Sequence, residues 1–264
     1  MLSEVLTFIF FILIGLEIRE GLNKPKDAIL PALAALGGMI VPALIFIAMI
    51  PGSDAWAVSM PTDVALAIGA LSILGKRVNP AVRLFLLTLA VADDFFSLVV
   101  IGIFFRQDLH LASAIYTLGA ASIGFLLPFR HRLIAILSPI ATFAIIPIYI
   151  FINLLTKLDF SLSTESIVVA VVVARVIGKV LGITLFTYLA TRFTSLKLPL
   201  ALDLKEIVGV GFLAGMGLTV SIVIAEITLQ TESELAQVRM GLFFAAILSG
   251  LLGLLWLKRF PASL

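Results

Sequence analysis

Long apolar stretches separated by short polar or charged clusters make up almost the whole chain. A helix needs about 20 mostly apolar residues to cross the hydrocarbon core of a bilayer. Dividing the chain at proline, glycine and charged clusters gives about nine such stretches: 2–22, 28–50, 56–75, 82–105, 111–128, 132–155, 165–192, 204–229 and 235–258. The pattern predicts an all-α polytopic membrane protein with about nine transmembrane helices.

Two of these stretches are predicted to be broken in the middle. In 56–75, Pro61 removes a backbone donor, and Thr62 and Asp63 after it are residue types that suit the start of a new helix. The other broken stretch, 204–229, has glycine and hydroxyl residues in its interior: Gly209, Gly211, Gly215, Gly217, Thr219 and Ser221. Each stretch is therefore expected to form two half-helices that meet at an unwound segment.

The two broken stretches occupy matching places along the chain. Each is the middle one of three, in 28–105 and in 165–258, and connecting helices in 106–164 make the second triplet enter the membrane in the opposite direction. Inverted repeats with broken central helices place a binding site where those helices cross. We therefore expect a single transmembrane transporter domain, 1–264, built from two inverted three-helix repeats.

Lysine and arginine are unevenly distributed between alternate loops. If the first stretch runs from outside to inside, the outer loops hold only Arg106, Lys157 and Arg239, and most other basic residues fall in the inner loops. Cytoplasmic loops carry the excess of basic residues. The distribution predicts an N-terminus outside and a C-terminus in the cytoplasm. The first stretch has no basic leader or small-residue cleavage site, so we expect a retained helix.

Composition agrees with a membrane location and excludes several classes of function. Apolar residues make up 61% of the 264 residues, charged residues 13%, and the mean hydropathy is +1.21. The net charge is only +2 and no basic run with interleaved aromatics occurs, so no nucleic-acid partner is expected. The chain has no cysteine and two histidines, and no phosphate loop or hydrolase motif, so no resident cofactor is expected.

Two adjacent acids, Asp93 and Asp94, lie in the middle of the apolar stretch 82–105. A central Asp costs about 2.5–3.5 kcal/mol on insertion scales, whereas a Leu or Val returns only about 0.3–0.6 kcal/mol, so the pair is expensive. Carboxylate oxygens bind hard cations or protons. Ionising one acid disfavours ionising the other, and a bound cation reverses that preference, so sodium and protons can compete for one site. The alternative is an interhelical salt bridge or hydrogen bond that only holds helices together.

Two basic residues fall inside the predicted span 165–192. Lys179 is too deep for easy snorkelling, and Asp93 is the expected partner of its ammonium group. Arg175, one turn earlier on the same face, is expected to snorkel outward or to pair with Glu165 or Glu226, in a structural role.

Several polar residues near these spans have both a structural and a functional interpretation. Asp63 is expected to cap a half-helix, or to offset the positive ends of two half-helices that face each other. Thr62 is expected to cap the same helix or to offer a neutral oxygen to an ion. Glu17 and Glu20, near the inner end of the first span, are interpreted as interfacial charges.

The motifs "GLEIREGL", "PTDVALAIGALSILGKRV", "FLLTLAVADDFFSLVVIGIFF", "RVIGKVLGI" and "GVGFLAGMGLTVSIVIAE" resemble, in order and over most of the chain, those of the NhaA-type sodium/proton antiporter family. The resemblance implies that Asp93 and Asp94 bind the ion and the proton, with Thr62 as a further transient Na⁺ ligand, and that Lys179 pairs with Asp93. It also implies that the broken-helix crossing is formed by Thr62, Asp63, Gly215, Gly217 and Thr219. The family exchanges internal sodium or lithium for external protons across the bacterial inner membrane.

The chain departs from the family pattern in several places. The first family helix and the hairpin behind it, which forms much of the family's dimer contact, are missing, and so are two helices in the middle, whereas the proposed transport core is retained. A homodimer would therefore need another contact. The family's DDLGA is DDFFS here, with Phe96 at a glycine position, and Ile134 and Ala135 replace residues linked to pH sensing in the family.

Two other functions compete with antiport. An intramembrane aspartyl protease also needs two buried carboxylates on facing helices, and Asp63 with Asp94 would supply them. That interpretation leaves Lys179 without a role, and the glycine-aspartate context expected of such a protease is missing. The other alternative is an inactive, truncated antiporter paralogue that acts only as an interaction protein.

Overall fold

The computed structural model describes residues 2–21, 25–75, 78–104, 111–128, 130–199 and 202–260, and in these ranges all regular structure is helical. The helices of the first half are α1 (Leu2–Gly21), α2 (Pro25–Met49), η1 (Asp54–Ser59), α3 (Val64–Ile73), α4 (Pro80–Phe104) and α5 (Leu111–Leu126). Those of the second half are α6 (Arg130–Ile140), η3 (Ala141–Ile145), α7 (Ile146–Asn153), η4 (Leu155–Lys157), η5 (Phe160–Leu162), α8 (Ser166–Val173), η6 (Ala174–Gly178), α9 (Lys179–Phe193), α10 (Leu204–Ala214), α11 (Thr219–Thr228) and α12 (Glu232–Arg259).

Each apolar stretch predicted from the sequence coincides with helical structure. Within the described ranges, five segments are long and apolar enough to cross a membrane: Ala28–Met49, Asp54–Ile73, Arg132–Lys157, Ser166–Phe193 and Glu232–Arg259. The bent pair α10 and α11 gives a sixth. Helices α1, α4 and α5 are not among these segments. The all-helical membrane fold is confirmed, and the number of nine crossings stays a prediction.

Both predicted breaks are present, but they differ in form. Helices α10 and α11 are bent by 50° at the segment between Ala214 and Thr219. In the other break, the chain before Pro61 forms the short 3₁₀ helix η1 rather than an α-helical half, and the backbone is extended at Asp63 before α3 begins. The first half-helix of this stretch is therefore a 3₁₀ helix, whereas the second is α-helical.

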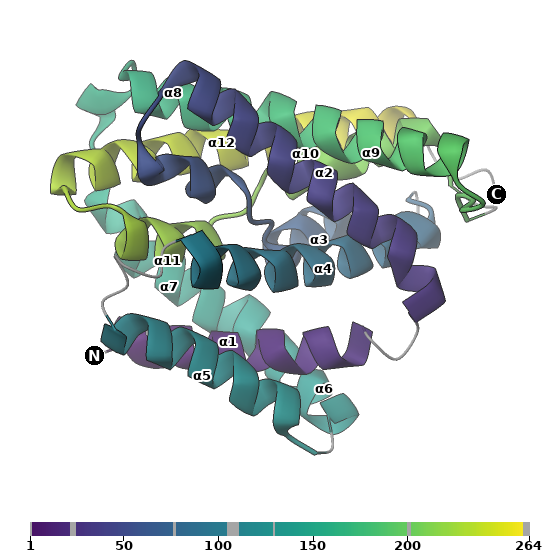
Figure 1. The fold of residues 1–264 in the computed structure, drawn as a ribbon, viewed down its shortest axis with the longest axis horizontal. Helices are drawn as coiled ribbons and strands as arrows, with labels where there is room; N and C mark the ends of the chain where they lie inside the picture. The colour runs from purple at the N-terminus through teal and green to yellow at the C-terminus, as the bar shows by residue number, and fades with distance from the viewer. Residues whose placement is uncertain are drawn as a thin grey trace.

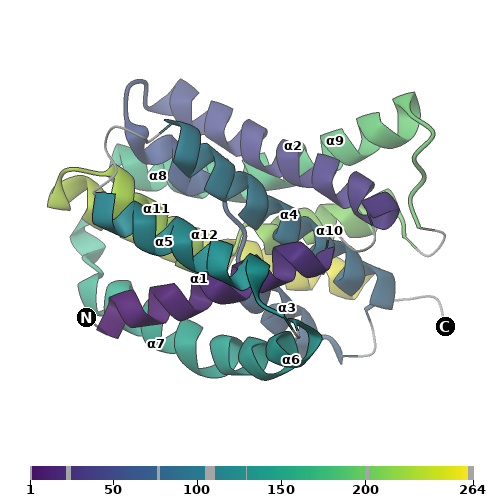
Figure 2. The ribbon, with the colours of Figure 1, turned by 60° about the horizontal axis from the view of Figure 1, so that its bottom comes forward.

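Helices α2 and α9 pack against each other along their length, and so do α1 and α5 (Figures 1 and 2). Glycines allow these contacts, as is common between membrane helices. A Cβ added to Gly182 would lie 2.0 Å from the carbonyl oxygen of Gly37, and one added to Gly124 would lie 2.0 Å from that of Ile12. The backbones therefore touch directly. The start of α1 and the end of α12 lie at opposite ends of the molecule (Figure 1).

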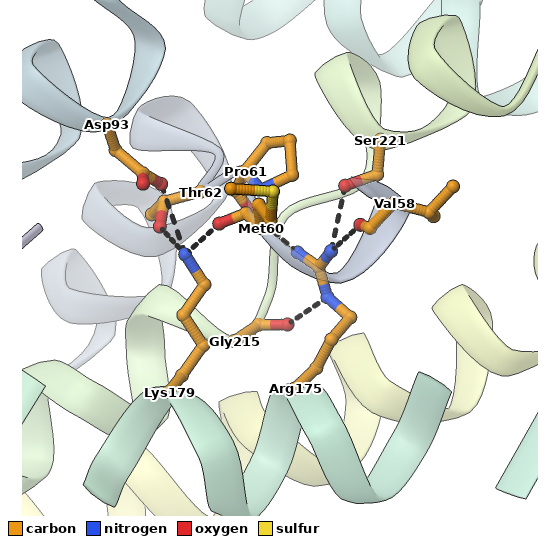
Figure 3. Close-up of polar contacts among 9 residues, drawn as sticks. All are labelled: Val58, Met60, Pro61, Thr62, Asp93, Arg175, Lys179, Gly215 and Ser221. Atoms are coloured by element: carbon orange, nitrogen blue, oxygen red, sulfur yellow. Dashed lines mark hydrogen bonds and ion pairs between the residues drawn. The ribbon is translucent and has the colours of Figure 1, made fainter. Parts of the chain in front are cut away.

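A segment of π-helix, η6, interrupts the long helix formed by α8 and α9. Wider π turns of this kind are frequent at functional sites. The buried Arg175 lies within it, and the buried Lys179 follows directly after it. Both side chains point from this helix toward the chain between η1 and α3 (Figure 3).

Candidate ion site at the broken helices

The two breaks contact each other through Asp63. Its carboxylate accepts a hydrogen bond from the backbone N–H of Leu66, at 3.3 Å, and so caps α3. The same carboxylate accepts hydrogen bonds from the backbone N–H of Thr219, at 3.3 Å, and from the Thr219 hydroxyl. One buried carboxylate thus lies at the N-terminal ends of α3 and α11, where the helix dipoles favour negative charge. This arrangement is the second of the two interpretations of Asp63 from the sequence, in which the carboxylate offsets the positive ends of two half-helices that face each other.

Lys179 is fully buried, and each of the three protons of its ammonium group has an acceptor. Its Nζ lies 3.1 Å from Oδ2 of Asp93 and 2.9 Å from Oγ1 of Thr62, and it donates a third hydrogen bond to the carbonyl of Met60 (Figure 3). The Asp93 carboxylate is itself fully buried. The ammonium therefore joins α4 to the break between η1 and α3.

Arg175 is also fully buried, and the expectation that it snorkels outward or pairs with Glu165 or Glu226 is wrong. Its guanidinium donates to acceptors in both breaks (Figure 3): the carbonyls of Val58 at 2.7 Å, Pro61 at 2.8 Å and Gly215 at 3.1 Å, and the hydroxyl of Ser221 at 2.8 Å. The physical reason is that broken helices leave carbonyl groups without intrahelical donors, and buried carbonyls need partners.

Asp94 has a different environment from its neighbour. The residue is 4% exposed, and its Oδ1 has no hydrogen-bond partner among the described residues. It borders a cavity of about 40 Å³ whose polar lining residues are Glu17, Thr62, Asp63, Asp94 and Ser138. A water molecule needs roughly 10–15 Å³ of such space, so the cavity has room for about three waters. The two adjacent acids are therefore divided between an ion pair and a cavity.

The three residues predicted to bind one ion, Asp93, Asp94 and Thr62, make different contacts in this structure. Asp93 does not border the cavity, and the Thr62 hydroxyl is bound to Lys179. Because successive helical residues point about 100° apart, Asp93 and Asp94 reach different neighbours. In the described part of the chain, no group of three or more carboxylate or imidazole side chains is arranged to hold a metal ion.

Sequence reasoning missed two residues of this region. Glu17 was interpreted as interfacial, but α1 crosses close enough to the breaks for this side chain to border the cavity. The side chain of Glu20 lies outside the described residues. Arg175 was placed on the correct helix face but with the wrong partners. A signal for the contacts of Arg175 was available, because two broken helices predict unpaired carbonyls and Arg175 is a long donor at the right depth.

Comparison with known proteins identifies the family. The family model described as "Na+/H+ antiporter 1" matches residues 1–131 and 128–257. The chain belongs to the NhaA family of sodium/proton antiporters. It is 32% identical to "Na(+)/H(+) antiporter NhaA 2" of Aliarcobacter butzleri, over 96% of this chain and 80% of that protein. It is 31% identical to an NhaA antiporter of Actinobacillus pleuropneumoniae and 30% identical to one of Salmonella paratyphi B, over 95% and 97% of this chain.

Family membership decides between two of the competing interpretations. NhaA proteins are ion transporters of the membrane and not enzymes, so the aspartyl protease interpretation is wrong. The chain spans about 80% of the length of its relatives in Aliarcobacter and Actinobacillus.

Proposed function

We propose that this protein is a secondary active antiporter that exports sodium or lithium in exchange for protons through the acids at 93 and 94. The observation that carries the proposal is the buried Asp94 carboxylate, which borders a cavity beside the crossing of two broken helices. A carboxylate in such a place binds either a proton or a cation, because either one neutralises it. Membership of the sodium/proton antiporter family supports this choice of ions.

The ammonium group of Lys179 is the structural basis for exchange at this site. It already binds Asp93 and Thr62, two of the groups that we propose as Na⁺ ligands beside Asp94. A sodium ion that approaches from the cavity would take over these oxygens, and Lys179 would have to withdraw from them. Sodium would then be bound by Asp93, Asp94 and Thr62 only transiently, and its departure would allow Lys179 and protons to return.

The proposed topology has nine crossings, with the N-terminus outside and the C-terminus in the cytoplasm of a bacterial inner membrane. Residues 28–105 and 165–258 would form two inverted repeats joined by connecting helices in 106–164. Two features support it: the breaks are in the middle helix of each repeat, and α1 starts at the end of the molecule opposite to the end of α12. The excess of basic residues in the inner loops sets the direction.

The proposal is tested by replacing Asp94 with Asn, which keeps the shape but cannot ionise. In proteoliposomes with a proton-sensitive dye, we expect sodium-dependent proton movement with the unchanged protein and a loss of at least about 100-fold with Asp94→Asn. The matched control is Asp159→Asn, since Asp159 is an exposed acid in the turn before η5. Equal transport by both variants would overturn the proposal. An inactive paralogue would instead show no transport with the unchanged protein.

The same pair of variants separates these outcomes in cells. A salt-sensitive strain that lacks its own antiporters should grow at high sodium with the intact gene and with Asp159→Asn, but not with Asp94→Asn. Expression is checked by immunoblotting of membranes. No rescue by the intact gene at normal expression would favour the inactive paralogue.

A further inference from the structure

Arg175 is a buried cation that the proposed exchange of ions does not use. All four acceptors that its guanidinium binds are uncharged. Burying a charge that is hydrogen-bonded only to neutral groups is costly, because it loses its hydration without a direct ion pair in return. Hydrogen bonds to a few carbonyl groups therefore do not by themselves explain why a charged arginine is buried at this position.

The hydrogen bonds of Arg175 hold the chain on both sides of Met60. The carbonyls of Val58 and Pro61 bind Arg175, whereas the carbonyl of Met60 between them binds Lys179 (Figure 3). Two cations one turn apart on a single helix thus hold one short segment of the other repeat. These hydrogen bonds orient the Met60 carbonyl. They also set the position of the Thr62 hydroxyl, which follows two residues later.

The second break is held by the same guanidinium. Arg175 binds the carbonyl of Gly215 and the hydroxyl of Ser221, at the two ends of the segment between α10 and α11. Gly217 lies within that segment, and a Cβ added there would lie 2.3 Å from Nη2 of Arg175 and 2.5 Å from the carbonyl oxygen of Pro61. Only a residue without a side chain fits between the guanidinium and the first break.

We propose that Arg175 is a positioning residue of the ion site, which ties both breaks to the helix that carries Lys179. By fixing Val58 and Pro61, it fixes the distance from Met60 and Thr62 to the Lys179 ammonium, and this keeps Lys179 on Asp93 and leaves Asp94 facing the cavity. The inference rests on the proposed antiport for its effect on ion binding. The positioning itself does not depend on transport.

The first test separates positioning from a merely structural role. In proteoliposomes, Arg175→Gln should raise the half-saturating sodium concentration by at least about 10-fold, while the maximal rate per folded molecule changes by less than about 3-fold, as expected for a loss of ground-state binding. Arg175→Lys, which keeps the charge but not the fork of donors, should be intermediate. The control is Arg192→Gln, at the exposed end of the same helix. Folding is checked by size-exclusion chromatography in detergent.

A second variant disturbs the same contact with Arg175 in place. Gly217→Ala should raise the half-saturating sodium concentration as Arg175→Gln does, and the double variant should show little more than either change alone, because both remove one interaction. Gly69→Ala is the control, since a Cβ there meets no atom within 4 Å. If Arg175→Gln does not fold, Arg175→Lys and Gly217→Ala carry the test. A half-saturating concentration equal to that of the unchanged protein in the folded variants overturns the inference.

A labelling experiment keeps this inference distinct from the proposed function. The chain has no cysteine, so a thiol can be introduced at one place. Ala65 borders the cavity just after the first break, and Ser72 is exposed further along α3. Arg175→Gln should change the alkylation rate of Ala65→Cys by at least about 3-fold and leave that of Ser72→Cys unchanged. Absence of transport by the unchanged protein would refute antiport, whatever the labelling shows. Altered labelling of Ala65→Cys would support the positioning role of Arg175, and unaltered labelling would refute it.

Discussion

Replacement of Lys179 by Met should be among the most destabilising single changes in the protein. The ammonium is fully buried and binds Asp93 at 3.1 Å and Thr62 at 2.9 Å, besides the Met60 carbonyl. Met fills a similar volume but leaves the Asp93 carboxylate buried without its partner. Removing one member of a buried ion pair costs about 3–5 kcal/mol. At about 2–4 °C per kcal/mol for a chain of this size, the melting temperature in detergent should fall by roughly 6–20 °C.

The double variant Asp93→Asn with Lys179→Met tests the cause of that loss. It removes both charges, and replacing a whole buried pair by neutral groups of similar volume is often close to neutral. We therefore expect it to recover at least about half of the lost melting temperature. The control, Lys157→Met, changes an exposed lysine and should shift the free energy of unfolding by less than about 0.5 kcal/mol.

The measurement is thermal unfolding of the purified protein. The folded fraction that remains after heating is determined by size-exclusion chromatography with detection of intrinsic fluorescence. A melting temperature of Lys179→Met within about 2 °C of the unchanged protein would refute the reasoning. So would a double variant less stable than Lys179→Met alone.

Other positions allow further predictions. Gly182→Ala should destabilise the fold by about 1–3 kcal/mol, because its Cβ would lie 2.0 Å from the Gly37 carbonyl oxygen. In the control, Gly119→Ala, the added Cβ meets no atom within 4 Å, so this variant should be neutral or slightly stabilising in the same thermal assay. Asp63→Ala removes the acceptor at the N-termini of α3 and α11 and should cost about 0.5–2 kcal/mol for each cap lost. Asp63→Asn keeps an acceptor oxygen and should recover part of this loss, so equal melting temperatures for the two variants would contradict the capping role of the side-chain oxygen.

The helical segments and both breaks were predictable from the sequence because they depend on local signals. Apolar runs of about 20 residues give the spans, and Pro61 and the glycines around Gly215 mark the breaks. Lys179 and Asp93 could be matched because each is a buried charge that needs an opposite one. The 3₁₀ form of η1 was not predictable, since it depends on how Arg175 and Lys179 hold the carbonyls of that segment.

The different environments of the two adjacent acids could not be predicted from the sequence. The sequence predicts that Lys179 pairs with Asp93, but nothing local says which neighbours the adjacent Asp94 meets. The choice depends on how α4 is rotated against α1 and the first break, which is set by packing between distant segments. Glu17 was missed for the same reason, since its distance from the breaks depends on where α1 crosses them.

The glycine contact between α2 and α9 constrains the path of ions through the protein. Where the backbones at Gly37 and Gly182 touch, no side chain can rotate aside and no file of water can form. That seam is closed on the side of the molecule away from α1. The cavity that Asp94 borders is lined instead by α1, α6 and the chain after the first break, through Glu17, Ser138 and Ala65. We therefore expect ions to reach Asp94 through this cavity rather than along the contact between α2 and α9.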